Sequence, residues 1–309
     1  IRDVAPSRGL GDVYKRQMRY NFSEHDLHRK DNGKRLYFTK CDCPASFADK
    51  NILLVHGLTY TQHVFDLNYK DYSVVRFLAK NGYTVWRVDI GGYGLSEEYE
   101  DGFDVTTENA AKDIITALEE ICRLQGVKKV DLLGWSWGCM TTAKVGEYRP
   151  DLVNKLVWIG TPFGGTIPAT EVKEPFTYLS YPYVIRVFQH MPGSDYDLDY
   201  LTVEPEVAGI WCDHVFNIDG RHGRPNGANR EIMACGDGWL IDTSKVKVPT
   251  CILNGDIDFY IDQNRVKQAF PALPEGSELH TFHGAGHALY CEVDYYKPFR
   301  ETLLKFLQK

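Results

Sequence analysis

The stretch Gly134-Trp135-Ser136-Trp137-Gly138 constrains the fold more than any other part of this chain. It follows the apolar run 130–133 and precedes residues 139–144, which are compatible with a helix. A strand that turns sharply into a helix at G-x-S-x-G lifts the serine hydroxyl out of the fold. Side chains at the glycine positions would collide with the neighbouring strand and helix. The pattern therefore predicts a strand–turn–helix unit that presents Ser136 as a nucleophile.

The rest of the chain alternates strand-like and helix-like patterns. This alternation predicts the α/β class, with a mostly parallel sheet flanked by helices on both faces. Continuous apolar runs such as Ile52–Val55 are typical of strands buried on both faces. The expected strands are residues 35–39, 52–55, 84–88, 130–133, 156–159, 250–253 and 278–282. The expected helices are residues 74–79, closed by Asn81-Gly82, residues 107–121, capped by Thr107, and residues 295–307.

The alternation stops after Gly160. Residues 163–228 are rich in proline, glycine and aromatic residues, and they lack a clean period. We expect them to form a cap inserted between two late strands, over the strand ends where ligands bind in open α/β sheets. Residues 18–162 and 229–309 would then form the core. Within the cap, the stretch around Pro182 is compatible with a kinked helix.

Composition excludes several classes of function. The net charge of −7 and the lack of a Lys/Arg run argue against a nucleic-acid surface. No apolar stretch approaches the roughly 18 residues that span a bilayer, and no secretory signal is recognised, so a cytoplasmic protein without membrane contact is expected. Residues 1–17 resemble translated sequencing-adaptor read-through; we exclude them from the fold and expect their removal to leave activity unchanged.

The eight cysteines do not predict a disulfide framework, because a chain of 309 residues needs no such staples. Cys41-Asp42-Cys43 is the one pair with a metal-like spacing, and no second pair of zinc-site spacing accompanies it. Neither a phosphate-binding glycine loop nor a dinucleotide fingerprint is recognised. We therefore expect no metal and no cofactor; oligomeric state is not readable from the sequence.

A serine nucleophile needs a base, and His287 is the preferred candidate. It ends the glycine-rich run 283–287, just after the last expected strand. A neutral imidazole can accept the Ser136 proton. His283 is the alternative, but the Gly-x-Gly immediately before His287 suits a histidine presented on a tight loop.

The base needs an acid to orient it, and the acid should follow the strand 250–253. Asp258 is preferred because it lies a few residues beyond the strand end, on the loop. Asp256 is expected to be a turn residue that bonds its own backbone. Asp262 lies just beyond this stretch.

The oxyanion of the reaction needs backbone donors. One is expected to be the N–H of Trp137, the residue after the nucleophile, and the second the N–H of Leu58. Leu58 follows His56-Gly57 at the end of an expected strand, and the glycine lets the backbone approach the substrate closely. His56 itself is expected to brace this loop rather than to act in the chemistry.

These motifs together resemble the α/β-hydrolase family over nearly everything from about Arg35 to the C-terminus, apart from the cap. They are His56-Gly57, Asp89–Ser96, Gly134–Gly138, Gly255–Asp258 and Gly284–His287. The resemblance implies an α/β-hydrolase fold with a Ser136, Asp258 and His287 triad, and it implies a structural turn for Asp89–Ser96. Dehalogenase and epoxide-hydrolase relatives place an aspartate where this chain has Ser136, and polyester synthases place a cysteine there.

The cap offers candidates for substrate binding. The aromatic residues expected to line an apolar roof are Tyr178, Tyr181, Tyr183, Phe188 and Trp211, with Trp135 and Trp137 beside the serine. Five of these are the candidates for substrate binding: Trp135, Tyr178, Tyr181, Phe188 and Trp211. The alternative is that they build the cap's own small core. A roomy aromatic pocket favours a bulky, mostly apolar ester or lactone. The Gly-Trp-Ser-Trp-Gly pattern, with the loop 56–59, also resembles capped esterases that act on macrolide lactones.

The triad does not fix the reaction, because fold and nucleophile are shared by several chemistries. The leading interpretation is hydrolysis of a small-molecule ester or lactone through an acyl-enzyme. C–C bond hydrolysis, thioester hydrolysis and acyl transfer remain open, as does a non-catalytic ligand-binding protein of this fold.

Overall fold

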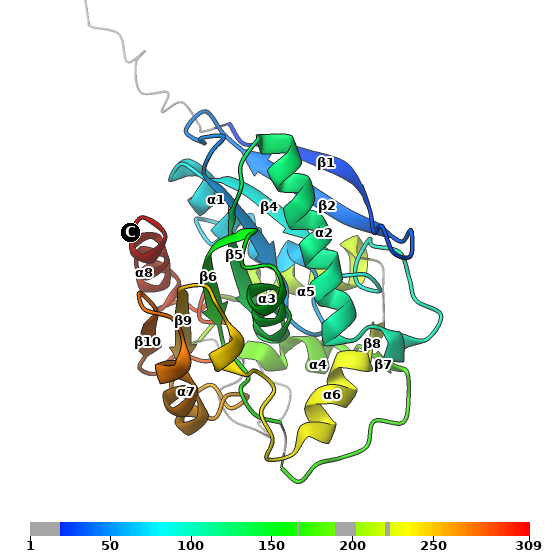
Figure 1. Ribbon diagram of the computed structural model, residues 1–309. Coiled ribbons are helices and arrows are strands. Elements are labelled where there is room, and N and C mark those ends of the chain that lie inside the picture. The colour runs from blue at the N-terminus through cyan, green and yellow to red at the C-terminus, as the bar shows by residue number, and fades with distance from the viewer. Residues whose placement is uncertain (1–18, 166, 189–201, 220–222) are drawn as a thin grey trace, which may run out of the picture.

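The computed structural model describes residues 19–165, 167–188, 202–219 and 223–309 (Figure 1). The expectation for residues 1–17 lies outside the described residues. None of the described helices is long and apolar enough to span a lipid bilayer.

The described residues contain one large sheet, with strands in the order β1-β2-β4-β3-β5-β6-β9-β10. The second strand of this order, β2, is antiparallel to both of its neighbours, and from β4 to β10 all neighbours are parallel. The strands are β1 (Asn21–His28), β2 (Arg35–Asp42), β3 (Asn51–Val55), β4 (Thr84–Val88), β5 (Val130–Trp135), β6 (Val153–Ile159), β9 (Thr250–Gly255) and β10 (Glu278–Phe282). The expected mostly parallel sheet is confirmed, and β1 is an additional strand that the sequence analysis did not predict.

Helices cover both faces of the sheet, which is why its strands are apolar on both sides. Along β3, Ile52 and Leu54 pack into one core cluster, whereas Leu53 and Val55 pack into the other. The first cluster contains residues of α1 and α8, and the second contains residues of α2, α3 and α7. Figure 1 shows α2 and α3 across one face. The helices are α1 (Val74–Lys80), α2 (Thr107–Gln125), α3 (Trp137–Tyr148), α7 (Gln263–Ala269) and α8 (Tyr296–Leu307).

The cap of α2 differs from the expectation by one residue. Thr106, not Thr107, is the N-cap, and its hydroxyl accepts a hydrogen bond from the N–H of Asn109. Thr107 is the first helical residue; its hydroxyl accepts from the Trp137 indole at 3.0 Å and donates to Glu231. Two adjacent threonines offer the same capping chemistry, and the tertiary partners of Thr107 decide between them.

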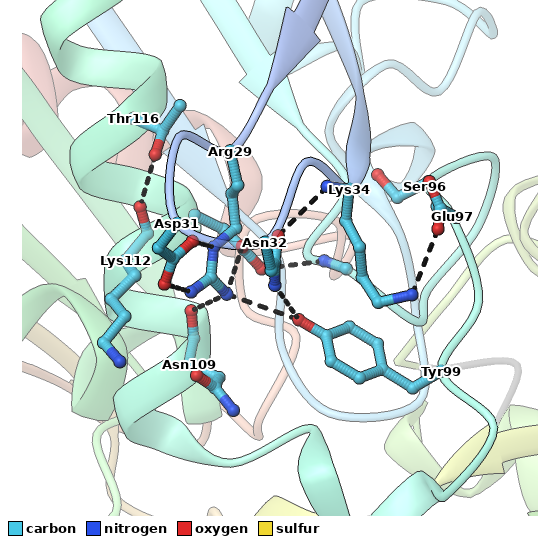
Figure 2. A network of polar contacts seen from close by, with 12 residues as sticks. Arg29, Asp31, Asn32, Lys34, Ser96, Glu97, Tyr99, Asn109, Lys112 and Thr116 are labelled. Atoms are coloured by element: carbon cyan, nitrogen blue, oxygen red, sulfur yellow. Dashed lines mark hydrogen bonds and ion pairs between the residues drawn. The ribbon is translucent and has the colours of Figure 1, made fainter.

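A buried arginine ties the turn between β1 and β2 to α2 (Figure 2). The guanidinium of Arg29 donates to Asp31, to Asp113 at 3.1 Å, to the Tyr99 hydroxyl and to the Asn109 carbonyl. Asp113 also accepts the N–H of Gly91 at 2.9 Å. The network therefore joins the edge of the sheet to the loop that follows β4.

The segment between β6 and β9 carries its own short elements. They are β7 (Phe176–Tyr178), α4 (Tyr181–Ile185), η3 (Arg186–Phe188), α5 (Pro205–Asp213), η4 (His214–Ile218), β8 (Gly223–Pro225), α6 (Gly227–Cys235) and η5 (Thr243–Lys245). The short strands β7 and β8 pair antiparallel, and Figure 1 shows them with α4 and α6 at the lower end of the molecule. The expected kinked helix is corrected: α4 begins at Tyr181, so Pro182 lies in its first turn, where proline costs no hydrogen bond.

Candidate active site

Ser136 occupies a strained turn between β5 and α3. Its φ of 55° is positive, a conformation that non-glycine residues rarely adopt. The turn is held by a hydrogen bond from the Ser136 N–H to the Ile159 carbonyl, at 2.8 Å. A Cβ added at Gly134 would lie 2.3 Å from the Gly138 carbonyl oxygen, and one added at Gly138 would lie 2.6 Å from that of Val55. Both glycines are therefore required for the turn, as the sequence predicts.

His287 and Asp258 form a buried hydrogen-bonded pair. The Nδ1 atom of His287 lies 2.7 Å from Oδ2 of Asp258, and the two side chains are 7% and 0% exposed. The other oxygen of Asp258 accepts the N–H of Tyr260 at 2.9 Å. An ionised carboxylate only accepts, so Nδ1 carries the proton and Nε2 has the free lone pair of a base. Asp258 thereby fixes the tautomer and the orientation of the ring.

Trp135 connects this pair to the serine turn. Its indole N–H donates to the carbonyl of His287 at 3.0 Å, and its ring lies 5.5 Å from the imidazole. A Cβ added at Gly160 would lie 2.9 Å from Nδ1 of His287. Gly160 directly follows Ile159, whose carbonyl holds Ser136. The base candidate thus packs against the residues that flank the serine turn.

Asp256 makes a second, exposed pair with the alternative histidine. Its Oδ2 atom lies 2.8 Å from Nδ1 of His283, whose side chain is 88% exposed. Its Oδ1 atom accepts the N–H of Gly284 at 2.7 Å, and this hydrogen bond is the main cause that lowers the pKa of Asp256. The expected turn residue therefore braces a loop 28 residues downstream.

Glu292 also holds the histidine loop, and the sequence analysis missed it. Its carboxylate accepts the N–H of Gly286 at 3.0 and 3.1 Å, and the residue is buried. No motif marks this glutamate, because it acts on the loop only through the folded backbone. The loop that presents His287 is therefore anchored by two carboxylates, one at Gly284 and one at Gly286.

The two expected oxyanion donors lie beside the turn. Trp137 is the first residue of α3, where backbone N–H groups have no intrahelical partner. Leu58 is half-buried and follows Gly57, where an added Cβ would lie 3.0 Å from the Ser136 Cβ. Thr59, the next residue, has a φ of 85°. Gly57 therefore lets the backbone approach Ser136 closely, and the expected approach to the substrate stays a prediction.

His56 braces this loop, as expected. Its Nε2 atom accepts the N–H of Ile90 at 3.1 Å, and its Nδ1 atom lies 2.9 Å from the Gly57 carbonyl. Complete burial lowers the pKa of His56 to about 4, so the ring is neutral. Asp89 is likewise structural: its carboxylate accepts the N–H groups of Gln62 and Leu95, and burial raises its pKa to about 6.

The five aromatic candidates for substrate binding divide into two groups. Trp135, Phe188 and Trp211 are fully buried. The Trp135 ring contacts those of Tyr60, Trp211 and Tyr290, and the Trp211 ring also contacts those of Tyr60 and Phe188, at centroid distances from 5.0 to 5.7 Å. Tyr178 is 85% exposed on β7, and Tyr181 is 49% exposed at the start of α4. In the first group, Phe188 and Trp211 from the segment between β6 and β9 pack in one core cluster with Trp135, which ends β5, whereas the two tyrosines face largely outward. Binding roles for all five remain predictions.

One metal-like cluster lies far from this site. Among the described residues, the ligand atoms of Cys251, Glu278 and His280 lie within 4.8 Å of one another. They occupy the first half of β9 and β10, whereas Asp258 and His287 follow the opposite ends of these strands. Burial raises the pKa of the Cys251 thiol, and Glu278 already pairs with His280 and Lys309. We therefore assign no metal to the cluster.

Known proteins resemble this chain over most of its length. The sequence pattern of a family described as "Serine aminopeptidase, S33" matches residues 47–294. The 2-hydroxy-6-oxononadienedioate/2-hydroxy-6-oxononatrienedioate hydrolase 2 of Pseudomonas putida is 24% identical over 237 residues, 74% of this chain and 78% of that protein. Epoxide hydrolase 3 of Siraitia grosvenorii is 28% identical over 212 residues, 68% of this chain and 60% of that protein.

A solved structure has a similar fold. The esterase EaEST of Exiguobacterium antarcticum superimposes with a TM-score of 0.65 at 20% identity, covering 93% of this chain and 100% of the esterase. The expected α/β-hydrolase fold is confirmed by this likeness and by the family match.

Proposed function

Because the chain belongs to the serine aminopeptidase S33 family of α/β hydrolases, we propose that it hydrolyses a carboxylic ester or lactone through an acyl-enzyme on Ser136. The observation that carries this proposal is the buried His287–Asp258 pair, held beside a strained serine by the Trp135 indole. The relatives named as hydrolases support the general class of reaction.

Each group has one role in the proposed reaction. The Ser136 hydroxyl attacks the ester carbonyl as Nε2 of His287 takes its proton. The backbone N–H groups of Trp137 and Leu58 bind the oxyanion, each contributing about 3 kcal/mol of transition-state stabilisation. The intermediate then collapses, and His287 gives the proton to the departing alkoxide, which leaves as the alcohol.

The second half repeats the proton transfers with water. His287 removes a proton from water, and the hydroxide attacks the acyl carbonyl. Collapse of this intermediate releases the carboxylic acid and returns the proton to Ser136. The Asp258 carboxylate accepts from Nδ1 of His287 and stabilises the imidazolium that forms twice in each cycle.

The buried aromatic cluster supports a bulky, mostly apolar substrate. The Trp135, Phe188 and Trp211 rings give an apolar environment where the cap meets the core. Within this class we propose macrolide lactones as the specific group to test. The substrate would be a small molecule, and the reaction as proposed needs no cofactor.

C–C bond hydrolysis is the alternative that one relative favours. The substrate in the name of the Pseudomonas putida hydrolase is a keto diacid without an ester group, so its hydrolysis does not break an ester bond. Thioester hydrolysis and acyl transfer differ only in the leaving group or the acceptor.

A mass-spectrometric assay of native protein and Ser136→Ala on acyl esters, macrocyclic lactones and a vinylogous 1,5-diketone tests the proposal. We expect multiple turnover of esters by the native protein and a loss of roughly 10³-fold or more in the variant. Turnover of the diketone alone would favour the alternative, and equal rates in both proteins would reject Ser136 as the nucleophile. Added alcohols separate hydrolysis from transfer through the products formed.

A further inference from the structure

A buried arginine in the cap has donors that meet no hydrogen-bond acceptor among the described residues. Arg224 lies in β8 and is 4% exposed. Its Nε and Nη1 atoms have no hydrogen-bond partner among the described residues. A guanidinium taken out of water without compensating acceptors is costly, and buried charges are normally paired. The unused donors of Arg224 therefore point to a group that is supplied from outside the described residues.

Arg29 shows how the same fold completes a buried guanidinium (Figure 2). Its nitrogen atoms reach the carboxylates of Asp31 and Asp113, the Tyr99 hydroxyl and a backbone carbonyl. Both arginines are nearly inaccessible, at 2% and 4% exposure, yet only Arg29 has carboxylate partners within the described chain. Arg29 is therefore a structural arginine, whereas Arg224 has donors that no described residue uses.

Arg224 and a second arginine, Arg186, both lie near the ring of Tyr183. The guanidinium carbons of Arg224 and Arg186 lie 5.7 and 5.2 Å from the centre of the Tyr183 ring. Arg186 also lies 5.8 Å from the Tyr260 ring, which is 4.7 Å from the His287 imidazole. Two positive charges around one ring repel each other unless an anion lies with them.

The neighbouring residue, Gly223, lies close to Thr59, which directly follows the predicted oxyanion donor Leu58. Gly223 lines a pocket with Thr59 and Tyr93, and the Tyr93 ring lies 5.5 Å from that of Trp137. Asp219 also lines this pocket, but its carboxylate is occupied by the Thr61 hydroxyl and by His63, each at 2.8 Å. The cap residues around Arg224 thus lie near the Tyr260 ring that contacts His287 and near Thr59, the residue after Leu58.

We propose that Arg224, assisted by Arg186, binds a carboxylate carried by the ester substrate. Carboxylate is a strong acceptor for the planar guanidinium, which can bind it through two parallel hydrogen bonds. The site would then select esters that have an apolar body and one anionic end. This inference rests on the proposed function, because it names the substrate class of the same site.

Paired esters test the assignment. Each pair consists of a neutral ester and the same ester with a carboxylate, for example phenyl butyrate and 3-carboxyphenyl butyrate, with released acid measured by mass spectrometry. We expect native protein to have a higher kcat/KM on the charged member. Arg224→Gln should lose about 10- to 100-fold on the charged ester and less than about 3-fold on the neutral one. Arg224→Lys should retain part of the preference.

Arg230→Gln is the matched control, since Arg230 is exposed in α6 and its removal changes the net charge equally. It should behave as the native protein, and thermal melting shows that each variant is folded. Equal losses on both esters in folded Arg224→Gln would overturn the inference, as would an absent preference in the native protein. In either case Ser136-dependent hydrolysis of the neutral ester would leave the proposed function standing.

A binding measurement keeps the two proposals separable. If no ester is turned over, the proposed function fails, and calorimetric titration of native protein with 3-hydroxybenzoate then tests Arg224 directly. Binding that is lost in Arg224→Gln and retained in Arg230→Gln would support the inference. Binding that is equal in the three proteins, or absent from the native one, would overturn it.

Discussion

Replacing Asp258 by asparagine should disable the proposed base while leaving the fold intact. The two oxygens of Asp258 accept from His287 Nδ1 and from the Tyr260 N–H, at 2.7 and 2.9 Å. An asparagine side chain has one oxygen and one NH2 group, so in either orientation it faces one of these donors with another donor. The imidazole then adopts the wrong tautomer or leaves its position.

The expected loss follows from this geometry. A buried carboxylate that orients the base of a serine triad contributes up to about 10⁴ in kcat, roughly 5.4 kcal/mol at 1.36 kcal/mol per tenfold change. We therefore expect Asp258→Asn to reduce kcat for ester hydrolysis by about 10³- to 10⁴-fold, with a smaller change in KM. Steady-state kinetics on one ester, with a circular dichroism spectrum for each variant, measures this loss.

Asp256→Asn is the matched control. Asp256 also bonds a histidine and a backbone N–H, but its partner His283 is exposed and lies outside the buried pair. We expect its activity to stay within about 3-fold of native, because an asparagine oxygen can still accept the Gly284 N–H and Glu292 still holds the loop at Gly286. If Asp256→Asn were the more damaging change, the assignment of the acid and of His287 as the base would be wrong.

Two further perturbations address the turn and the loop. Gly138→Ala should lower both stability and kcat, because the added Cβ would lie 2.6 Å from the Val55 carbonyl oxygen. In the control Gly209→Ala, the added Cβ meets open space in α5, and the free energy of unfolding should rise by up to about 1 kcal/mol. An unchanged melting temperature of Gly138→Ala would contradict the steric argument. For His56, whose pKa is lowered to about 4, the unfolded state binds the proton first, so its stability contribution is present above about pH 6.5 and is lost as the pH falls toward 4. Denaturant titrations should therefore show native protein losing about 2 kcal/mol more than His56→Gln between pH 7 and 5, and parallel profiles would refute the assignment.

Strands were predictable from the sequence where a long apolar run ends at a recognisable turn. The run before Ser136 is β5, and the glycines around it are required by contacts of less than 3 Å. The Asp258 and His287 positions were predictable because each follows a strand whose carboxyl end lies at the same edge of a parallel sheet. Periodicity and turn chemistry suffice for these features.

Other features depend on tertiary contacts that no local pattern records. The choice of Thr106 over Thr107 as the cap of α2 follows from the partners of Thr107 in other elements. The strand β1 is polar on its exposed face and therefore shows no apolar run. Glu292 holds Gly286 only because folding brings it to the histidine loop, and the burial of Arg224 likewise results from packing that no local pattern records.

The most direct test of the central claim is covalent labelling of the protein with a fluorophosphonate, followed by peptide mapping by mass spectrometry. The reagent phosphonylates an activated serine hydroxyl and mimics the first tetrahedral intermediate. We expect one label per chain, located on Ser136, with labelling slowed in a His287→Ala variant and absent from Ser136→Ala. A label on another residue, or labelling of Ser136 at an equal rate without His287, would contradict the proposed mechanism.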